Sequence, residues 1–284
     1  MENYKTVIYK LSICGTDKLI GVGMIGNLEM LLCLYFHYKC NIYFDMYSNG
    51  HCIVYDKDYE IDSNITNPFE YYFEPLFDIK NINQEIFFPE SHWSFPEIAY
   101  GKFELKYKNI YYEIRNMFFK NYKIKDDILN FINYYEETHL NCNDILGVHI
   151  RASDMMATGQ NYDIEYFINK IKYILEKRTI NKIFLATDDN EIIKTCTNIF
   201  NTKEILYLNN IERVDNINRS IGQHDRINTE NHNYNSRKYH NYLCGKEVII
   251  DTFLLSKCNY FLRSNSAVSD LAILFSDKIQ EVFN

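Results

Sequence analysis

The chain has 284 residues, of which 46% are hydrophobic and 16% aromatic, and its formal net charge is −8 at pH 7. This apolar content excludes an intrinsically disordered chain and is ample for two domains of about 140 residues each. The negative charge argues against nucleic acid or an anionic membrane as the main partner, because both require a broad basic surface.

In the first half of the chain, two strands and three helices are expected. The pattern predicts strands at 6–11 and 41–46, a glycine-rich turn at 21–26, and helices at 27–37, 103–119 and 126–135. Residues 48–100 are rich in turn formers and show no clear period. The strand–turn–helix–strand order of the first 46 residues is half of an α/β unit, and a domain boundary is expected near 137–143.

The glycine-rich turn contains Gly23 and Gly26 and runs into Asn27. Glycines let a backbone approach a ligand closely, so these residues are candidate binding residues. A tight turn without any ligand explains them equally well.

The second half predicts a βαβ unit followed by a further helix–strand–helix segment. Its expected elements are a strand at 145–150, a helix at 164–177, a strand at 182–186, a helix that begins at Asp251, a short strand, and a helix at 267–275. Residues 209–241 are polar and rich in Asn, and we expect them to form a long loop at the mouth of a cleft.

Polar side chains gather at the carboxyl end of the first strand in this half. His149, Arg151 and Asp154 lie at or just beyond the end of the apolar run 145–150. Open α/β sheets bind ligands beyond the carboxyl ends of their strands, and the planar fork of Arg matches a phosphate. A structural Arg–Asp pair at a strand end is the alternative interpretation.

Two later segments add to this pattern. The strand at 182–186 leads into Asp188 and Asp189, which we interpret mainly as structural partners at the strand end. Asp251 begins a helix, and Ser264, Asn265 and Ser266 form a hydroxyl-rich turn that opens the next helix. Such a turn offers N–H groups and hydroxyls to an anion, although a plain helix cap needs the same residues.

In this order the motifs resemble those of the fucosyltransferases that use GDP-fucose: the α-1,6-fucosyltransferases, nodulation fucosyltransferases and protein O-fucosyltransferases. The resemblance covers roughly residues 145–275. The α-1,6 group has His-x-Arg-x-x-Asp, then Leu-Ala-Thr-Asp-Asp, then an Asp-headed helix leading to a Ser turn, and this chain is similar in each segment. The resemblance implies an α/β fold of two Rossmann-like domains facing a cleft, the GT-B type. Residues 1–140 would form the acceptor-side domain and 141–284 the domain that binds the nucleotide sugar.

The resemblance also implies inverting, metal-independent transfer of fucose from GDP-fucose to a glycan or protein hydroxyl, with no cofactor. Its catalytic residues would be Arg151 and Asp154. The residues that bind GDP-fucose would be His149, Arg151, Asp251, Ser264, Asn265, Ser266, Gly23, Gly26 and Asn27.

Some positions differ from the α-1,6 pattern. Ala152 stands in place of a second Arg, Met155 in place of a Lys, and residues 158–160 contain no Glu that could act as base. The alternatives are therefore an enzyme for another nucleotide sugar, a catalytically inactive nucleotide- or glycan-binding protein, and a metal-dependent transferase of the other major fold. The sequence identifies neither the acceptor, nor the linkage, nor the oligomeric state.

Neither a metal site nor a membrane span is predicted. The eight cysteines are scattered singly without a Cys-x-x-Cys pair, and His224, His232 and His240 have no further ligands at metal-binding intervals. We expect reduced thiols and no zinc. No run of 18 or more apolar residues is present and residues 1–5 do not open a secretory signal, so a cytoplasmic location is expected.

Overall fold

The computed structural model describes part of the chain: residues 6–10, 28, 32, 35, 41–45, 65, 67–79, 85–87, 104–152, 163–211, 213 and 238–284. The chain forms two compact units, one from Met1–Phe131 with Arg237–Val248 and the other from Ile132–Ser236 with Ile249–Asn284. The division falls inside two helices, α3 (Asp126–His139) and α7 (His240–Leu255). The domains expected at 1–140 and 141–284 stay a prediction.

Unit 1 contains a parallel sheet with β1 (Thr6–Lys10) between β2 (Asn41–Asp45) and β4 (Glu85–Phe87). A separate antiparallel pair joins β3 (Phe73–Pro75) to β5 (Tyr122–Ile124), which directly follows α2 (Lys108–Asn121). The strands expected at 6–11 and 41–46 are confirmed to within one residue. The expected helix at 103–119 begins instead as a 3-10 turn, Leu105–Tyr107. Three-residue strands such as β3 and β4 are too short to show a period, which is why none was predicted there.

Aromatic side chains build the core of unit 1. Phe69, Phe73, Phe118 and Tyr122 are fully buried, and their rings meet with centroids 4.8 to 5.5 Å apart. Tyr122 also serves the backbone of β2, because its hydroxyl accepts a hydrogen bond from the N–H of Phe44 (2.8 Å). Leu28, Leu32 and Tyr35, which lie in the helix expected at 27–37, are helical and fully buried.

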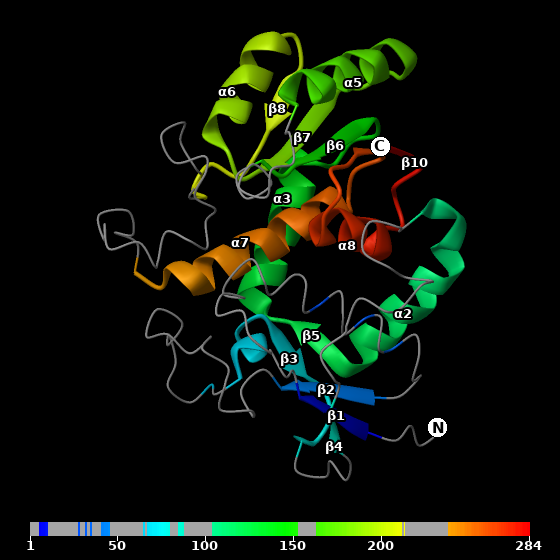
Figure 1. Ribbon diagram of the computed structural model, residues 1–284, viewed down its shortest axis with the longest axis vertical. Coiled ribbons are helices and arrows are strands. Elements are labelled where there is room, and N and C mark those ends of the chain that lie inside the picture. The colour runs from blue at the N-terminus through cyan, green and yellow to red at the C-terminus, as the bar shows by residue number, and fades with distance from the viewer. Residues whose placement is uncertain are drawn as a thin grey trace. The chain divides into compact units, whose positions relative to one another are not determined.

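Unit 2 is a five-stranded parallel sheet in the order β10-β9-β6-β7-β8 (Figure 1). The strands are β6 (Ile145–Ile150), β7 (Lys182–Thr187), β8 (Glu204–Leu206), β9 (Tyr260–Leu262) and β10 (Glu281–Phe283). Every residue of β6 is buried. A continuous apolar run is typical of a parallel strand covered on both faces, and the strand expected at 145–150 is confirmed.

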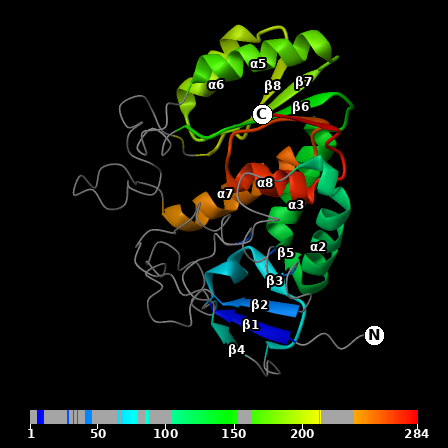
Figure 2. The ribbon, with the colours of Figure 1, turned by 45° about the vertical axis from the view of Figure 1, so that its right-hand side comes forward.

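Helices cover both faces of this sheet (Figures 1 and 2). On one face lie α5 (Ile164–Lys177) and α6 (Asn190–Ile199), whose buried residues share one apolar cluster with β6 and β7. On the other face lie α8 (Ala267–Phe275) and the parts of α3 and α7 that belong to unit 2. The helices expected at 164–177 and 267–275 are confirmed.

A glycine in β6 allows close packing on this second face. A Cβ atom on Gly147 would lie 3.1 Å from Cβ of Cys258 and 3.3 Å from Cδ2 of Leu255. Any larger side chain would therefore push the connection between α7 and β9 away from the sheet.

The helix that was expected to begin at Asp251 begins instead at His240, so this prediction is wrong and Asp251 lies well inside α7. Its first half packs within unit 1 through Tyr72, whose hydroxyl donates to the carbonyl of Tyr242 (3.0 Å) and whose ring stacks on Tyr242 at 5.6 Å. A Cβ on Gly245 would lie 2.7 Å from Cζ of Tyr72. Tertiary contacts thus stabilise a helix where the polar composition had predicted the end of a loop. The part of that loop from 214 to 237 lies outside the described residues.

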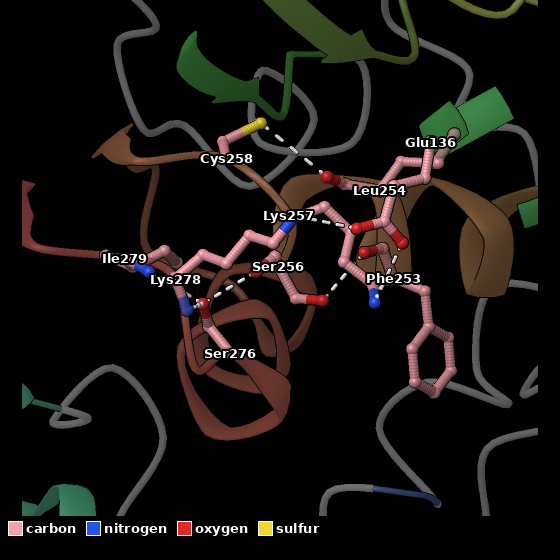
Figure 3. A network of polar contacts seen from close by, with 9 residues as sticks. All are labelled: Glu136, Phe253, Leu254, Ser256, Lys257, Cys258, Ser276, Lys278 and Ile279. Carbon is pink, nitrogen blue, oxygen red and sulfur yellow. Dashed lines mark hydrogen bonds and ion pairs between the residues drawn. The ribbon is translucent and has the colours of Figure 1, made fainter. Parts of the chain in front are cut away.

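A polar network joins three elements of unit 2 (Figure 3). The Glu136 carboxylate of α3 pairs with Lys257 (3.0 Å) after α7 and with Lys278 (2.7 Å) after α8. Ser276 donates to the carbonyl of Ser256 at 2.6 Å. Burial alone would raise the pKa of Glu136, but the hydrogen bonds from the two lysines outweigh it and lower that pKa.

Candidate functional site

The strand order of unit 2 marks one point where a ligand can bind. From β6 the chain adds β7 and β8 on one side, and later β9 and β10 on the other. Successive connections therefore leave the carboxyl ends of β6 and β9 in opposite directions, and open α/β sheets bind ligands at such a switch point. His149 lies at this end of β6, and Ser264, Asn265 and Ser266 follow β9.

Serine hydroxyls surround the imidazole of His149 at this point. Its Nδ1 atom lies 2.9 Å from the hydroxyl oxygen of Ser264, 2.9 Å from that of Ser269 and 3.2 Å from that of Ser266. The N–H of Ser264 also donates to the carbonyl of His149 at 3.0 Å. Because His149 is only 7% exposed, its ring fixes the serine turn against the end of β6.

The serine turn leads directly into the first turn of α8. Ser266 is the N-cap of α8, and its hydroxyl accepts from the N–H of Ser269. Arg263 and Asp270, which flank this segment, form an ion pair of 2.6 Å, and their side chains are 4% and 0% exposed. The pair joins the end of β9 to α8, so the hydroxyls and N–H groups of the turn have a fixed frame. Asn265 is exposed at its tip.

Arg151 and Ala152 continue from β6 at the same edge. The side chain of Arg151 is half-buried, and the N–H of Ala152 donates to the carboxylate of Asp188 at 2.9 Å. Asp189 is fully buried and caps α6 by accepting from the N–H of Glu191. The interpretation of Asp188 and Asp189 as structural partners at the end of β7 is therefore confirmed.

The remaining predicted residues are not part of the His149 cluster described above. Asp251 lies in α7, where its carboxylate interacts electrostatically with the Tyr135 hydroxyl. Burial, and after it the Asp251 carboxylate, raise the pKa of Tyr135 to about 12. Asp154, Gly23, Gly26 and Asn27 lie outside the described residues, as do the side chains of His224, His232 and His240.

Three features of this edge were not predicted. Ser269 faces His149 from one turn inside α8, the Arg263–Asp270 pair is buried, and Arg213 is 6% exposed beside the end of β7. The spacing of Ser266 and Ser269, a cap residue and the position three residues later, was a usable signal for the first feature. Only the fold reveals the others, because their partners depend on how strands and helices pack.

The described part of the edge can bind an anion. It combines the half-buried guanidinium of Arg151, three hydroxyls and the amino end of a nine-residue helix. Backbone N–H groups and the helix dipole favour negative charge at that position, and Arg is the side chain best matched to phosphate. Among the described residues, no group of three or more His, Cys, Asp or Glu could hold a metal ion. Nor is any helix in the described ranges long and apolar enough to cross a membrane.

These features define an α/β fold with a candidate anion site at the carboxyl edge of a parallel sheet. No family model matches the chain, and no curated protein matches its sequence. Solved structures do match.

The fucosyltransferase NodZ from Bradyrhizobium aligns with a TM-score of 0.52 and 16% identity, covering 96% of this chain and 94% of its own. Two further structures of NodZ α-1,6-fucosyltransferase, one co-crystallised with GDP and one soaked with GDP-fucose, give TM-scores of 0.52 and 0.51 at 16% identity. Both alignments cover 96% of this chain and 93% of theirs. The resemblance to fucosyltransferases is thus confirmed at the level of the fold.

Proposed function

We propose that this chain is a glycosyltransferase that transfers fucose from GDP-fucose to a hydroxyl of a glycan or protein acceptor. The observation that carries the proposal is the His149–serine cluster at the switch point of unit 2. It is supported by a fold shared with NodZ, whose solved structures include one soaked with GDP-fucose and one with GDP.

The chemistry requires the site to stabilise a leaving diphosphate. As the bond between the sugar and the β-phosphate breaks, negative charge grows on the phosphate, and preorganised donors aimed at that charge are usually the largest catalytic term. We assign this role to Arg151, to the N–H groups of Asn265 and Ser266, and to the hydroxyls of Ser264 and Ser266; the N–H of Ser264 is already bound to the carbonyl of His149. Since these groups supply the positive charge and the donors, the proposed transfer needs no metal. Inversion at the anomeric carbon of the sugar is part of the proposal because the sequence motifs resemble those of fucosyltransferases that use GDP-fucose.

Other predicted residues take supporting roles in the proposal. His149 is tied to the serines through Nδ1, so a contact with the nucleotide would use Nε2. Asp251 would hold the guanine or orient a neighbouring group. Asp154 would position Arg151 or meet the acceptor.

The two Rossmann-like domains would face a cleft in the GT-B manner, with the acceptor bound mainly by the N-terminal domain and GDP-fucose by the C-terminal one. Gly23, Gly26 and Asn27 would approach GDP-fucose from the N-terminal side. The enzyme would work in the cytoplasm.

One observation favours a second candidate, a nucleotide-binding protein without turnover. Ala152 is fully buried, and its N–H is bound to Asp188. Where the α-1,6 pattern has a second Arg, this chain therefore has only the methyl group of Ala152 and no positive charge. A protein of this kind would bind the nucleotide sugar, lose binding in an Arg151→Ala variant, and transfer nothing.

Calorimetric titration tests the proposal. GDP-fucose, GDP-mannose and UDP-glucose are titrated with and without EDTA into the wild type, Arg151→Ala and the control Arg178→Gln, which changes an exposed arginine paired with Glu281. We expect binding of GDP-sugars that resists EDTA, prefers GDP-fucose, survives in the control and is lost in Arg151→Ala. Absence of binding to any of the three sugars contradicts the proposal. GDP release from bound GDP-fucose in the presence of mixed acceptors separates the enzyme from the inactive binding protein.

A further inference from the structure

Unit 2 contains two buried arginines with different partners. Arg263 is 6% exposed and pairs with the carboxylate of Asp270. Arg213 is also 6% exposed, yet its described partners are neutral: Nε donates to the carbonyl of Thr187 (3.0 Å) and Nη2 to the carbonyl of Leu208 (2.9 Å). Among the described residues, no carboxylate forms an ion pair with Arg213. Asp188 and Asp189 follow Thr187 directly, yet neither forms an ion pair with Arg213. A buried charge outside an ion pair is costly, so its retention needs a reason.

The guanidinium of Arg213 lies on the edge of the sheet where the candidate site is found. Thr187 is the last residue of β7, and it stands opposite Ile150, the last residue of β6. Arg151 follows Ile150 directly. Since neighbouring strands lie about 5 Å apart, Arg213 is on the order of 10 Å from the start of the Arg151 side chain.

We propose that Arg213 supplies a second positive charge to the diphosphate of the nucleotide sugar; this inference rests on the proposed function. The chemical class that it recognises is a nucleoside diphosphate, whose charge exceeds that of a single guanidinium. Its bonds to two carbonyls hold the cation in place without neutralising it. The face of the Tyr207 ring, 5.6 Å from the guanidinium, holds it in the same way.

A purely structural role would need only hydrogen-bond donors. Neutral donors could bridge the carbonyls of Thr187 and Leu208 without the cost of burying a charge. A phosphate bound beside Arg151 would lie on the order of 10 Å from Arg213, and at an effective dielectric constant of about 20 two unit charges at that distance attract strongly enough to change a dissociation constant roughly 15-fold. The charge, more than the geometry of the bridge, is therefore expected to govern the affinity for phosphate.

The test compares GDP with guanosine, which has the same base and sugar but no phosphate. Both are titrated into the wild type, Arg213→Gln, Arg213→Lys and the control Arg178→Gln. Arg178 follows α5 and precedes β7, so the control removes the same charge from the amino-terminal edge of the same sheet. Thermal unfolding of each variant verifies that it is folded.

We expect Arg213→Gln to raise the Kd for GDP roughly 15-fold and to leave the Kd for guanosine within about twofold. The lysine variant keeps the charge and should keep the GDP affinity within about threefold of wild type.

The following results would overturn the inference. Unchanged GDP binding in Arg213→Gln overturns it while the proposed function stands. Equal losses for GDP and guanosine in both variants would mean a structural role only. If Arg213→Gln does not fold, the lysine variant decides, since near-wild-type GDP affinity sustains the inference and an equal loss for both ligands ends it. Absence of GDP binding by the wild type removes the proposed function and this inference together.

Discussion

Replacing Asp270 by leucine tests the frame of the serine turn. The change leaves the Arg263 guanidinium, 4% exposed, without the carboxylate that lies 2.6 Å from it. Removing one partner of a buried ion pair costs about 3–5 kcal/mol, because the remaining charge stays desolvated. With an m-value of about 3 kcal/mol per M, the urea midpoint of unit 2 should fall by roughly 1–2 M.

The double variant Arg263→Met, Asp270→Leu is the matched control. It removes both charges and replaces them with apolar side chains, a change that is often neutral or stabilising. We therefore expect it to recover most of the lost stability. Urea unfolding followed by circular dichroism gives the free energies for the full double-mutant cycle. A single variant that loses less than about 1 kcal/mol, or a double variant as unstable as the single one, would refute the reasoning.

Three further predictions concern positions outside the serine turn. Gly245→Ala should destabilise unit 1 by about 1–3 kcal/mol in urea unfolding, because the new methyl group overlaps the buried ring of Tyr72; wild-type stability would contradict that packing. Glu136 has a lowered pKa in the folded protein, so its contribution to stability is present above pH about 4.5 and is lost as the pH falls through the folded pKa. Stability measured from pH 7 to 3 should fall less steeply in Glu136→Gln, and parallel curves would argue against the effect. Exposed Cys142 should react with a thiol reagent in the native state before buried Cys258, whose pKa is raised by burial; peptide mapping after labelling would show the reverse order if Cys258 were accessible.

The sequence was sufficient to predict the bounds of an element where its apolar residues form a continuous run or a regular period. The bounds of β6, α5 and α8 agree with those expected from apolar runs and periodicity. The sequence was insufficient where tertiary contacts stabilise an element. The first half of α7 contains few apolar residues in a regular order, and Tyr72 stabilises it through contacts that no local pattern shows.

The candidate site was likewise predicted only in part from the sequence. The order of motifs predicted that His149 and the serine turn would lie at one sheet edge, since both follow strands of the same parallel sheet. It did not predict that a single ring nitrogen would lie near three hydroxyls. Arg213 was missed because its partners are backbone carbonyls, which every residue has, so no residue type in the sequence signals the contact.

The central claim is that the carboxyl edge of unit 2 binds a GDP-sugar. A crystal structure of the chain soaked with GDP tests it most directly. We predict the diphosphate within hydrogen-bonding distance of the Arg151 guanidinium and of the turn formed by Ser264, Asn265 and Ser266. GDP bound at another place, with this edge empty, would contradict the claim.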